Sequence, residues 1–375
     1  MDTPRRPRLA HVATVVLVLF AGNVRANAAS PVTLRAYTTT AWTNNLFQSQ
    51  SERSEKIQQL AFDADLGGAG MAGYYTGRVD LYGDYEDLFT QTHTVGLTSS
   101  RTGGSHQRLT GDLQATLRAS RAAYNYREYL EMRATVAFRR YLRPTLMLRG
   151  HTGLALRNYQ HAGDFSYVEP TAWAEISRFL ASGTTFVAGT EAGVKAYVRN
   201  STADSTSVWS RSSGSGSQIL ASMWLKVAQS LGAGTGLQLR YSLRSLWTGQ
   251  SRYRQADDYE PVDELFDDDY GHDGPALRMT LKHLRRRFEA VLIGEAARRH
   301  YEGRPALDLD GLPLGETRSD RRTSLRLRLS REIHAPAPAT DAALKFDASV
   351  GSVSSNDPFY DTSMRLLSLT LEVGF

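Results

Sequence analysis

The chain ends with MRLLSLTLEVGF, residues 364–375, in which apolar and polar side chains alternate strictly from Leu367 onward. Successive side chains of a strand point to opposite faces, so this period of two predicts a β-strand with one apolar face. The apolar face carries Leu367, Leu369, Leu371, Val373 and Phe375. A soluble protein can end on a half-buried strand, but an apolar last residue beside the free carboxylate is less usual.

The first residues predict an export signal rather than a part of the fold. Arg5, Arg6 and Arg8 form a positive start, an apolar run of roughly a dozen residues follows, and ANA at Ala26–Ala28 fits a cleavage site. Residues 1–28 are therefore expected to be a signal peptide. An uncleaved membrane anchor is the alternative, but the apolar run is short for the roughly twenty residues that a helical span needs.

Composition predicts one exported domain without disulfide bonds. The sequence has no cysteine, and its 41% hydrophobic and 22% charged residues are spread evenly, with no linker that divides residues 29–375. After the signal, no apolar run is long enough for a transmembrane helix. The net charge of +5 comes from residues distributed along the chain rather than gathered on one face, so no nucleic-acid partner is expected.

Alternation recurs along the whole sequence and predicts about sixteen strands, with fourteen as the main competitor. Apolar residues at every second position would scatter around a helix, so a helical reading fails. The predicted spans are 31–43, 57–66, 69–83, 88–100, 107–121, 126–141, 145–159, 164–178, 184–198, 218–230, 235–248, 275–285, 288–301, 320–333, 343–355 and 364–375. They average about a dozen residues, which is long for globular strands but suits tilted strands that cross a bilayer.

The lengths of the connections predict which rim faces the periplasm and which faces outward. Even-to-odd connections are mostly short, whereas all the long ones run from odd to even strands, at 44–56, 199–217, 248–274 and 302–319. Short turns on the periplasmic rim and long loops outside are typical of an outer-membrane barrel. The predicted fold class is therefore all-β, a single closed antiparallel transmembrane β-barrel.

Together with these features, the terminal strand resembles the C-terminal signature of Gram-negative outer-membrane β-barrel proteins, porin-like ones included. The resemblance implies a bacterial outer-membrane location, outer-membrane lipid as one partner and the barrel assembly machinery as another. It also implies that Leu367, Leu369, Leu371, Val373 and Phe375 act as the assembly signal. Physical chemistry supports closure, because each unpaired backbone group in hydrocarbon costs several kcal/mol.

A finer resemblance is weaker. AWTNNLFQ at Ala41–Gln48 looks like the first-strand ending of several large, uncharacterised outer-membrane barrels, and SSNDPFYD at Ser354–Asp361 looks like their closing loop. Some of those barrels belong to exporters that carry a periplasmic helical-repeat domain. No such segment precedes the first predicted strand, so a role in an export system is kept only as an alternative.

The polar face of the strands is rich in arginine. Alternation assigns to the lumen Arg118, Arg133, Arg139, Arg149, Arg157, Arg240, Arg244, Arg278, Arg326 and Arg328. Basic rings can favour anions in a pore. Cross-strand ion pairs that stiffen the wall are the other reading, and the two can hold together.

Two further groups of residues invite an assignment. Trp42, Tyr141, Tyr159, Tyr197, Trp247 and Tyr301 are placed near the rims as interfacial aromatics. The loop QADDYEPVDELFDDDYGHDG concentrates acids, and Asp267, Asp268 and Asp269 are weak candidates for Ca²⁺ ligands. The spacing does not match an EF-hand loop, so a solvated acidic loop is favoured over metal binding, folding into the pore or repulsion of anionic ligands.

The sequence thus predicts a channel for passive diffusion of small polar solutes, because a sixteen-stranded barrel is wide enough for water. A non-conducting structural or adhesion barrel is the first alternative. A rim-located enzyme acting on lipid is the second, and it lacks support because the sequence has no G-x-S-x-G, H-E-x-x-H or P-loop motif. No cofactor is expected, and the strand patterns leave the oligomeric state open.

Overall fold

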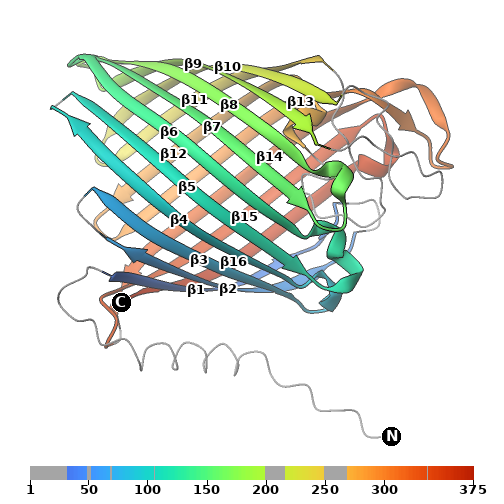
Figure 1. The fold of residues 1–375 in the computed structure, drawn as a ribbon, viewed down its shortest axis with the longest axis horizontal. Coiled ribbons are helices and arrows are strands. Elements are labelled where there is room, and N and C mark those ends of the chain that lie inside the picture. The colour runs from blue at the N-terminus through green and yellow to red at the C-terminus, as the bar shows by residue number, and fades with distance from the viewer. Residues whose placement is uncertain are drawn as a thin grey trace, which may run out of the picture.

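A computed structural model describes residues 32–48, 52–67, 70–104, 106–198, 216–248, 268–335 and 337–375. The predicted signal peptide, residues 1–28, lies outside this range. Sixteen strands follow one another around a single sheet (Figure 1). They are β1 (Val32–Thr43), β2 (Glu55–Leu66), β3 (Met71–Tyr82), β4 (Thr90–Gly103), β5 (Gln107–Ser120), β6 (Tyr129–Arg143), β7 (Leu146–Tyr159), β8 (Tyr167–Phe179), β9 (Thr184–Tyr197), β10 (Ser217–Gly232), β11 (Thr235–Thr248), β12 (Gly274–Arg285), β13 (Phe288–Leu307), β14 (Pro313–Ile333), β15 (Asp341–Ser355) and β16 (Thr362–Gly374).

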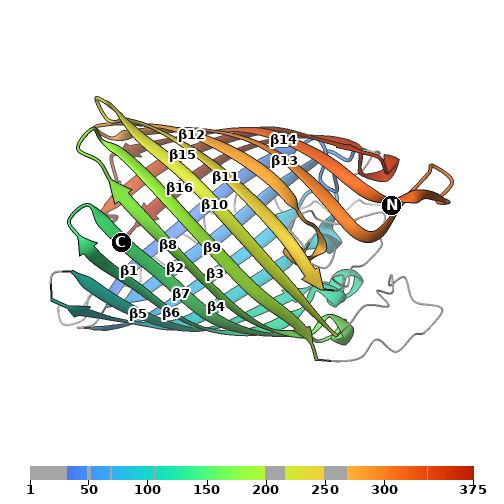
Figure 2. The ribbon, with the colours of Figure 1, turned by 90° about the horizontal axis from the view of Figure 1, so that it is seen from above.

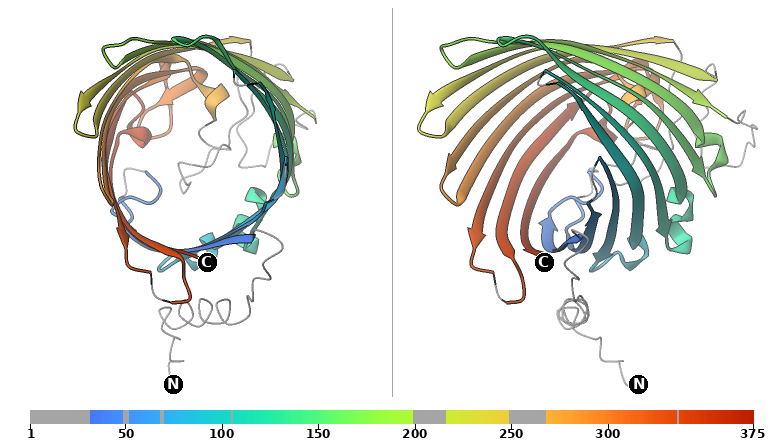
Figure 3. Two further views of the ribbon diagram at one scale, coloured as in Figure 1. Left: turned by 90° about the vertical axis from the view of Figure 1, so that its left-hand side faces the viewer. Right: turned by 60° about the vertical axis from the view of Figure 1, so that its left-hand side comes forward.

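The sheet closes on itself. Each strand pairs antiparallel with its neighbours in sequence, and β1 pairs with β16 from Arg35↔Gly374 to Thr43↔Leu366. Figure 3 shows this ring in a view along the barrel. The structure therefore confirms the closed barrel and sixteen strands rather than fourteen.

Side chains on the outer face of the wall are apolar and exposed. On β16, Leu367 and Leu369 are 45% and 49% exposed, and similar leucine, valine and methionine positions recur on the other strands. Their exposure is explained if lipid covers them, because burying apolar area contributes about 25 cal/mol per Å². Within the described residues, no helix is both long and apolar enough to span a membrane.

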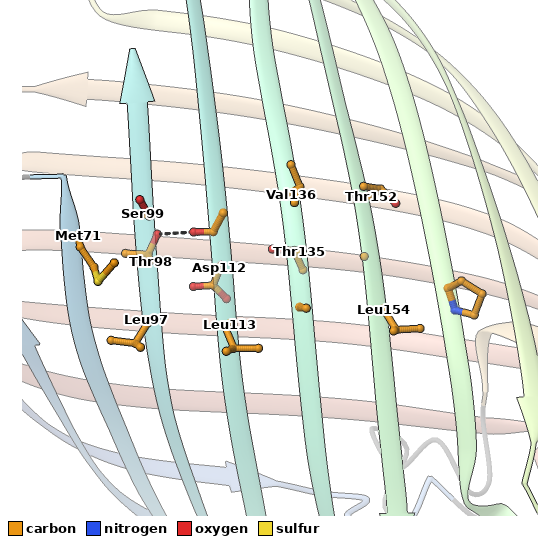
Figure 4. A pocket seen from close by; sticks show the side chains of 14 residues that line it. Met71, Leu97, Thr98, Ser99, Asp112, Leu113, Thr135, Val136, Thr152 and Leu154 are labelled. Carbon is orange, nitrogen blue, oxygen red and sulfur yellow. Dashed lines mark hydrogen bonds between the residues drawn. The ribbon is translucent and has the colours of Figure 1, made fainter. Parts of the chain in front are cut away.

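A shallow hollow interrupts this outer face between β4 and β8 (Figure 4). Leu97, Leu113 and Leu154 line it with large side chains, whereas Gly111 and Ala134, which also line it, contribute almost no side chain. The hollow follows from small residues set among large ones, and hydrocarbon chains can fill it.

The two rims of the barrel differ. One rim, here called the turn rim, carries the even-to-odd connections, the start of β1 and the end of β16. These connections are short, and their lengths lie between those of 144–145 and 334–340. The opposite rim, here called the loop rim, carries the odd-to-even connections and all the described 3₁₀ helices. These are η1 (Glu86–Leu88), η2 (Ala122–Arg127), η3 (Gly163–Phe165), η4 (Asp269–Gly271) and η5 (Pro358–Tyr360). By the usual rule the turn rim faces the periplasm.

The prediction of a long loop at 302–319 is wrong. β13 and β14 contain 20 and 21 residues and form one continuous hairpin, whose turn is only 308–312. Gly303, Pro305 and Pro313 broke the alternation on which the prediction depended. The structure accommodates them by a register shift between His300 and Pro305 and by placing Pro313 at a strand start, where no ladder donor is needed.

Aromatic residues fill the inner side of the loop rim. Tyr159 and Tyr167 are each 2% exposed and pack with Tyr126 and Phe165. A second cluster joins Leu46, Phe47, Tyr82 and Leu88, so the AWTNNLFQ segment packs into the fold. The prediction that Tyr159 and Tyr301 form part of an interfacial girdle is therefore wrong, since both are buried, while Trp42 and Trp247 are exposed.

Candidate functional site

The ten arginines singled out from the sequence occupy equivalent places in the wall. Each lies beside an outward apolar residue on its strand; Arg133, for example, follows Met132, which is 50% exposed. The arginines thus share the face opposite the lipid-facing side chains. Seven of them have a carboxylate partner: Arg133, Arg149, Arg157, Arg244, Arg278, Arg326 and Arg328.

Several of these ion pairs are shared by two arginines. The buried carboxylate of Glu131 accepts hydrogen bonds from Arg133 Nε at 3.1 Å and from Arg157 Nε at 2.8 Å. Asp347 does the same for Arg326 and Arg328, at 2.8 and 3.1 Å. One acid between two guanidinium groups fixes the side chains and still leaves an excess of positive charge.

Three cations on β10, β11 and β12 are less compensated. The register places Lys226 opposite Arg240 and Arg240 opposite Arg278. Arg278 Nε lies 2.8 Å from Glu295, whereas neither Lys226 nor Arg240 has a carboxylate at ion-pair distance within the described residues. The Arg240 guanidinium instead lies 5.0 Å from the ring centre of Trp224.

The remaining arginines have other neighbours. Arg139 lies over the ring of Tyr141 at 6.0 Å and is opposite Arg149 in the register. Arg118 is paired in register with Tyr129. The arginines therefore form several groups with different compensation rather than one uniform ring.

A segment of the β11–β12 connection, residues 268–273, folds against the inner wall and lies inside the ring of strands in Figure 3. Lys195 Nζ on β9 is 2.8 Å from Asp268 Oδ2, and these side chains are only 4% and 5% exposed. Asp268 Oδ1 also accepts a hydrogen bond from the backbone N–H of Tyr270, and Asp268 is therefore the N-cap of η4. This buried ion pair holds the segment in place, because the loss of either side chain would leave the other charge buried without compensation.

Tyr270 extends this attachment to β8. Its hydroxyl donates to Glu169 Oε1 at 3.0 Å, and its ring lies against Gly193, where a Cβ would come within 2.2 Å of the hydroxyl oxygen. Burial, and then the charge of Glu169, raise the pKa of Tyr270 above its ordinary value. The phenol therefore remains a hydrogen-bond donor at neutral pH.

The other side of the segment contacts β11 and β13. Arg244 Nη1 is 2.9 Å from Asp269 Oδ1 and 2.8 Å from His272 Nε2, and the His272 ring lies 5.5 Å from that of Tyr301. Asp273 pairs with His300 on β13. The segment therefore spans the inner wall from β8 to β13 near the loop rim and narrows the barrel there.

These contacts correct the reading of the acidic loop. The favoured solvated state is wrong for Asp268, which is buried, and the alternative of folding inward is right for this part of the loop. Asp268 and Asp269 are both engaged by cations, and Asp267 lies outside the described residues. In the described part of the chain, no three metal-ligating side chains come together.

Comparison with solved structures places this barrel among known ones. OpdL of Pseudomonas aeruginosa matches with a TM-score of 0.54 at 10% identity, over 93% of this chain and 99% of OpdL. OccD3 (OpdP) of the same organism gives 0.52 at 9% identity over 93% and 91%. OccAB1 of Acinetobacter baumannii gives 0.51 at 10% identity over 95% and 99%. No protein-family model and no curated protein sequence matches the chain.

Identity this low shows the fold alone. The chain shares the closed β-barrel fold of these proteins, and the fold predicted from its alternation and its last strand is confirmed. Solute, selectivity and partners have to be argued from its own residues.

Proposed function

We propose that the protein is a channel for passive diffusion of small polar solutes, with a constriction formed by residues 268–273 and the wall of β8–β13. A sixteen-stranded barrel leaves room for an aqueous path, and the inward face is polar. The attachment of the segment through Lys195 and Tyr270 supports a fixed constriction rather than a free loop.

We further propose that the ten arginines line the lumen and that the channel prefers anions. The observation that carries this proposal is the ladder of Lys226, Arg240 and Arg278, which faces one carboxylate, Glu295, within the described residues. A positive wall with a low-dielectric backing raises the local concentration of anions. The paired arginines contribute mainly to the stiffness of the wall.

The test is conductance of the purified protein in planar bilayers, with the reversal potential measured in a salt gradient. We expect anion preference, and we expect the double variant Lys226→Gln and Arg240→Gln to lower the anion-to-cation permeability ratio by about two-fold. The matched control is Arg278→Gln with Glu295→Gln, which removes an ion pair without changing the net charge and should leave the ratio near that of the native protein.

Two results would reject parts of this proposal. Cation preference of the native protein would contradict the lumen assignment. Persistent silence of a correctly folded sample would reject the channel in favour of a non-conducting structural or adhesion barrel. Co-purification of an export partner would instead support a role in an export system.

We propose no catalytic role for the rims. His93, His161 and His283 bond to Tyr75, Glu128 and Thr235 respectively, and none of these contacts activates a serine nucleophile. Lipase or acyltransferase activity of the purified protein on outer-membrane lipids would overturn this.

A further inference from the structure

The β13–β14 hairpin reaches well beyond the loop rim (Figures 1 and 2). β12 begins at Gly274, next to the bridge between Asp273 and His300, and the pairing of β14 with β15 stops at Asp320↔Ser355. β13 and β14 nevertheless continue to pair with each other as far as Leu307↔Pro313. Among the described residues, therefore, no strand pairs with either side of the outer part of the hairpin, residues 301–319.

The base of this hairpin is rigidly held. Asp320 is fully buried and accepts hydrogen bonds from Arg318 Nε at 3.0 Å and Nη2 at 2.7 Å. The Arg318 guanidinium lies between the rings of Tyr301 and Tyr360, at 4.2 and 3.3 Å from their centres. Leu307 N–H donates to Asp357 on the neighbouring loop at 3.2 Å. These contacts combine charge-assisted hydrogen bonds with cation–π stacking in a desolvated setting.

The tip of the hairpin, residues 307–316, is also ordered. Asp308 Oδ1 accepts hydrogen bonds from the backbone N–H groups of Asp310 and Leu312, at 2.9 and 2.8 Å. Gly311 adopts a φ of +79°, which a glycine reaches without strain. A tip that its own hydrogen bonds hold in shape loses little entropy when it binds a partner.

The chemistry of the tip is apolar and acidic. Leu309, Leu312 and Leu314 are 67%, 62% and 47% exposed, and they lie on the part of the hairpin that projects beyond the loop rim. Asp310 and Glu316 are exposed among them. Arg304, the basic residue of the outer hairpin before the base, is buried against Tyr301. The surface that the tip presents is therefore apolar with negative charge.

We propose that residues 307–316 form a docking surface for a cationic, amphipathic polypeptide outside the cell. Leucines at the centre of a contact would supply apolar burial, and the surrounding carboxylates would orient a basic partner. An anionic lipid surface would be repelled by the same carboxylates. Two tips of two copies would likewise repel each other, so neither lipid nor a second tip matches this charge.

The test uses the full protein in zwitterionic nanodiscs, with empty nanodiscs as the blank. The probes are two synthetic amphipathic peptides of equal length and apolar pattern, one with lysine and one with glutamate as its polar residue. A glycine/lysine peptide without an apolar face is the third probe. We expect the leucine/lysine peptide to bind more tightly than both others in a fluorescence anisotropy titration.

Two variants separate the contributions of the tip. Leu309→Ser with Leu312→Ser, and Asp310→Asn with Glu316→Gln, should each raise the Kd of the leucine/lysine peptide about tenfold. The matched controls are Val198→Ser, an exposed apolar residue at the same rim, and Glu86→Gln with Asp87→Asn, an exposed acidic pair on η1. Both controls should bind like the native protein.

The proposal is wrong if the tip variants bind the peptide as well as the native protein, or if the glutamate peptide binds equally. It is also wrong if the tip variants dissociate an oligomer in sedimentation velocity, because the tip would then contact a second copy. Circular dichroism checks that the variants remain folded. Because binding is measured by anisotropy, the result does not depend on whether the protein conducts.

Discussion

Tyr270 connects the β11–β12 segment to β8 through one hydroxyl group. Because the neutral phenol is the form that donates to Glu169, the attachment depends on its protonation. An ordinary tyrosine titrates near pH 10, and burial raises the pKa of Tyr270 above that value. The folded state therefore keeps the proton longer than an unfolded chain does. Its contribution to the attachment is complete below about pH 10 and falls above it.

The Tyr270→Phe variant tests this contact. It removes a hydrogen bond to a charged acceptor, worth about 2 kcal/mol, while keeping the ring against Gly193. We expect single-channel recordings of the variant to show more current noise and a larger mean conductance than those of the native protein. In the native protein, we expect Tyr270 to stay protonated and the conductance to be unaffected by it between about pH 6 and 9. Tyr241→Phe, on the outer face, is the control and should conduct like the native protein. Identical traces for both variants would show that the hydroxyl does not hold the segment.

Sequence reasoning works unevenly at the level of single residues. The face of Arg133 or Arg326 follows from alternation alone, because a strand leaves only two directions. The partners do not follow, because Lys195 meets Asp268 across 73 positions of sequence and carries no local signal. Tyr159 and Tyr301 were assigned to the lipid interface because aromatic residues near strand ends suit that place. Tyr159 lies two positions after Arg157, so alternation places it on the same inner face as that arginine.

The last strand is the element with the clearest double role. β16 joins β15 and β1, and its final residue continues the pairing, since Phe375 N–H donates to Leu34 O at 2.8 Å and Leu34 N–H donates to Phe375 O at 3.3 Å. The resemblance to outer-membrane signatures adds a second role, recognition by the assembly machinery. The two roles can be separated, because one acts on the folded barrel and the other acts before it.

We therefore expect Phe375→Ser to lower the amount of folded protein in the outer membrane several-fold. The same variant, refolded after purification, should unfold at nearly the native denaturant concentration, because the backbone pairing at the seam remains. Phe359→Ser in η5 is the matched control, since it removes an exposed phenylalanine from a loop and should accumulate normally. Normal accumulation of the Phe375 variant would remove the assembly signal from this residue.

Most elements could be predicted from alternation and turn residues because long strands with one apolar face repeat the same pattern many times. Predicted and observed bounds agree within a few residues, for example 235–248 for β11 and 184–198 against Thr184–Tyr197 for β9. Alternation stops where its physical reason ends. Beyond the loop rim no lipid requires an apolar face, so the outer parts of β13 and β14 carry no such pattern, and their sequence predicts a loop instead.

For the whole molecule, closure decides between a membrane barrel and an open sheet. An open edge at β1 or β16 would leave a row of backbone groups unpaired in hydrocarbon, at several kcal/mol each. The structure removes both edges by pairing the two strands over nine positions, from Arg35↔Gly374 to Thr43↔Leu366. The AWTNNLFQ segment adds to this seam at the loop rim, where Asn45 Nδ2 donates to Ser363 O at 3.0 Å.

A disulfide across this seam tests closure directly, because the native chain has no cysteine. Thr39 and Thr370 are opposite each other in the register, and their Oγ1 atoms are 2.7 Å apart on the same face. Opposite residues of antiparallel strands are about 4.5–5.5 Å apart at Cα, within the range that a disulfide accepts. We expect Thr39→Cys with Thr370→Cys to oxidise in the folded protein and to shift the denatured band in electrophoresis, because nearly the whole chain becomes one covalent loop.

Thr39→Cys with Thr94→Cys is the control, since β4 is three strands from β1, about 14 Å away, and no bond should form. If the seam pair stays reduced under conditions that oxidise other adjacent-strand pairs, β1 and β16 are not joined and the channel loses its structural basis.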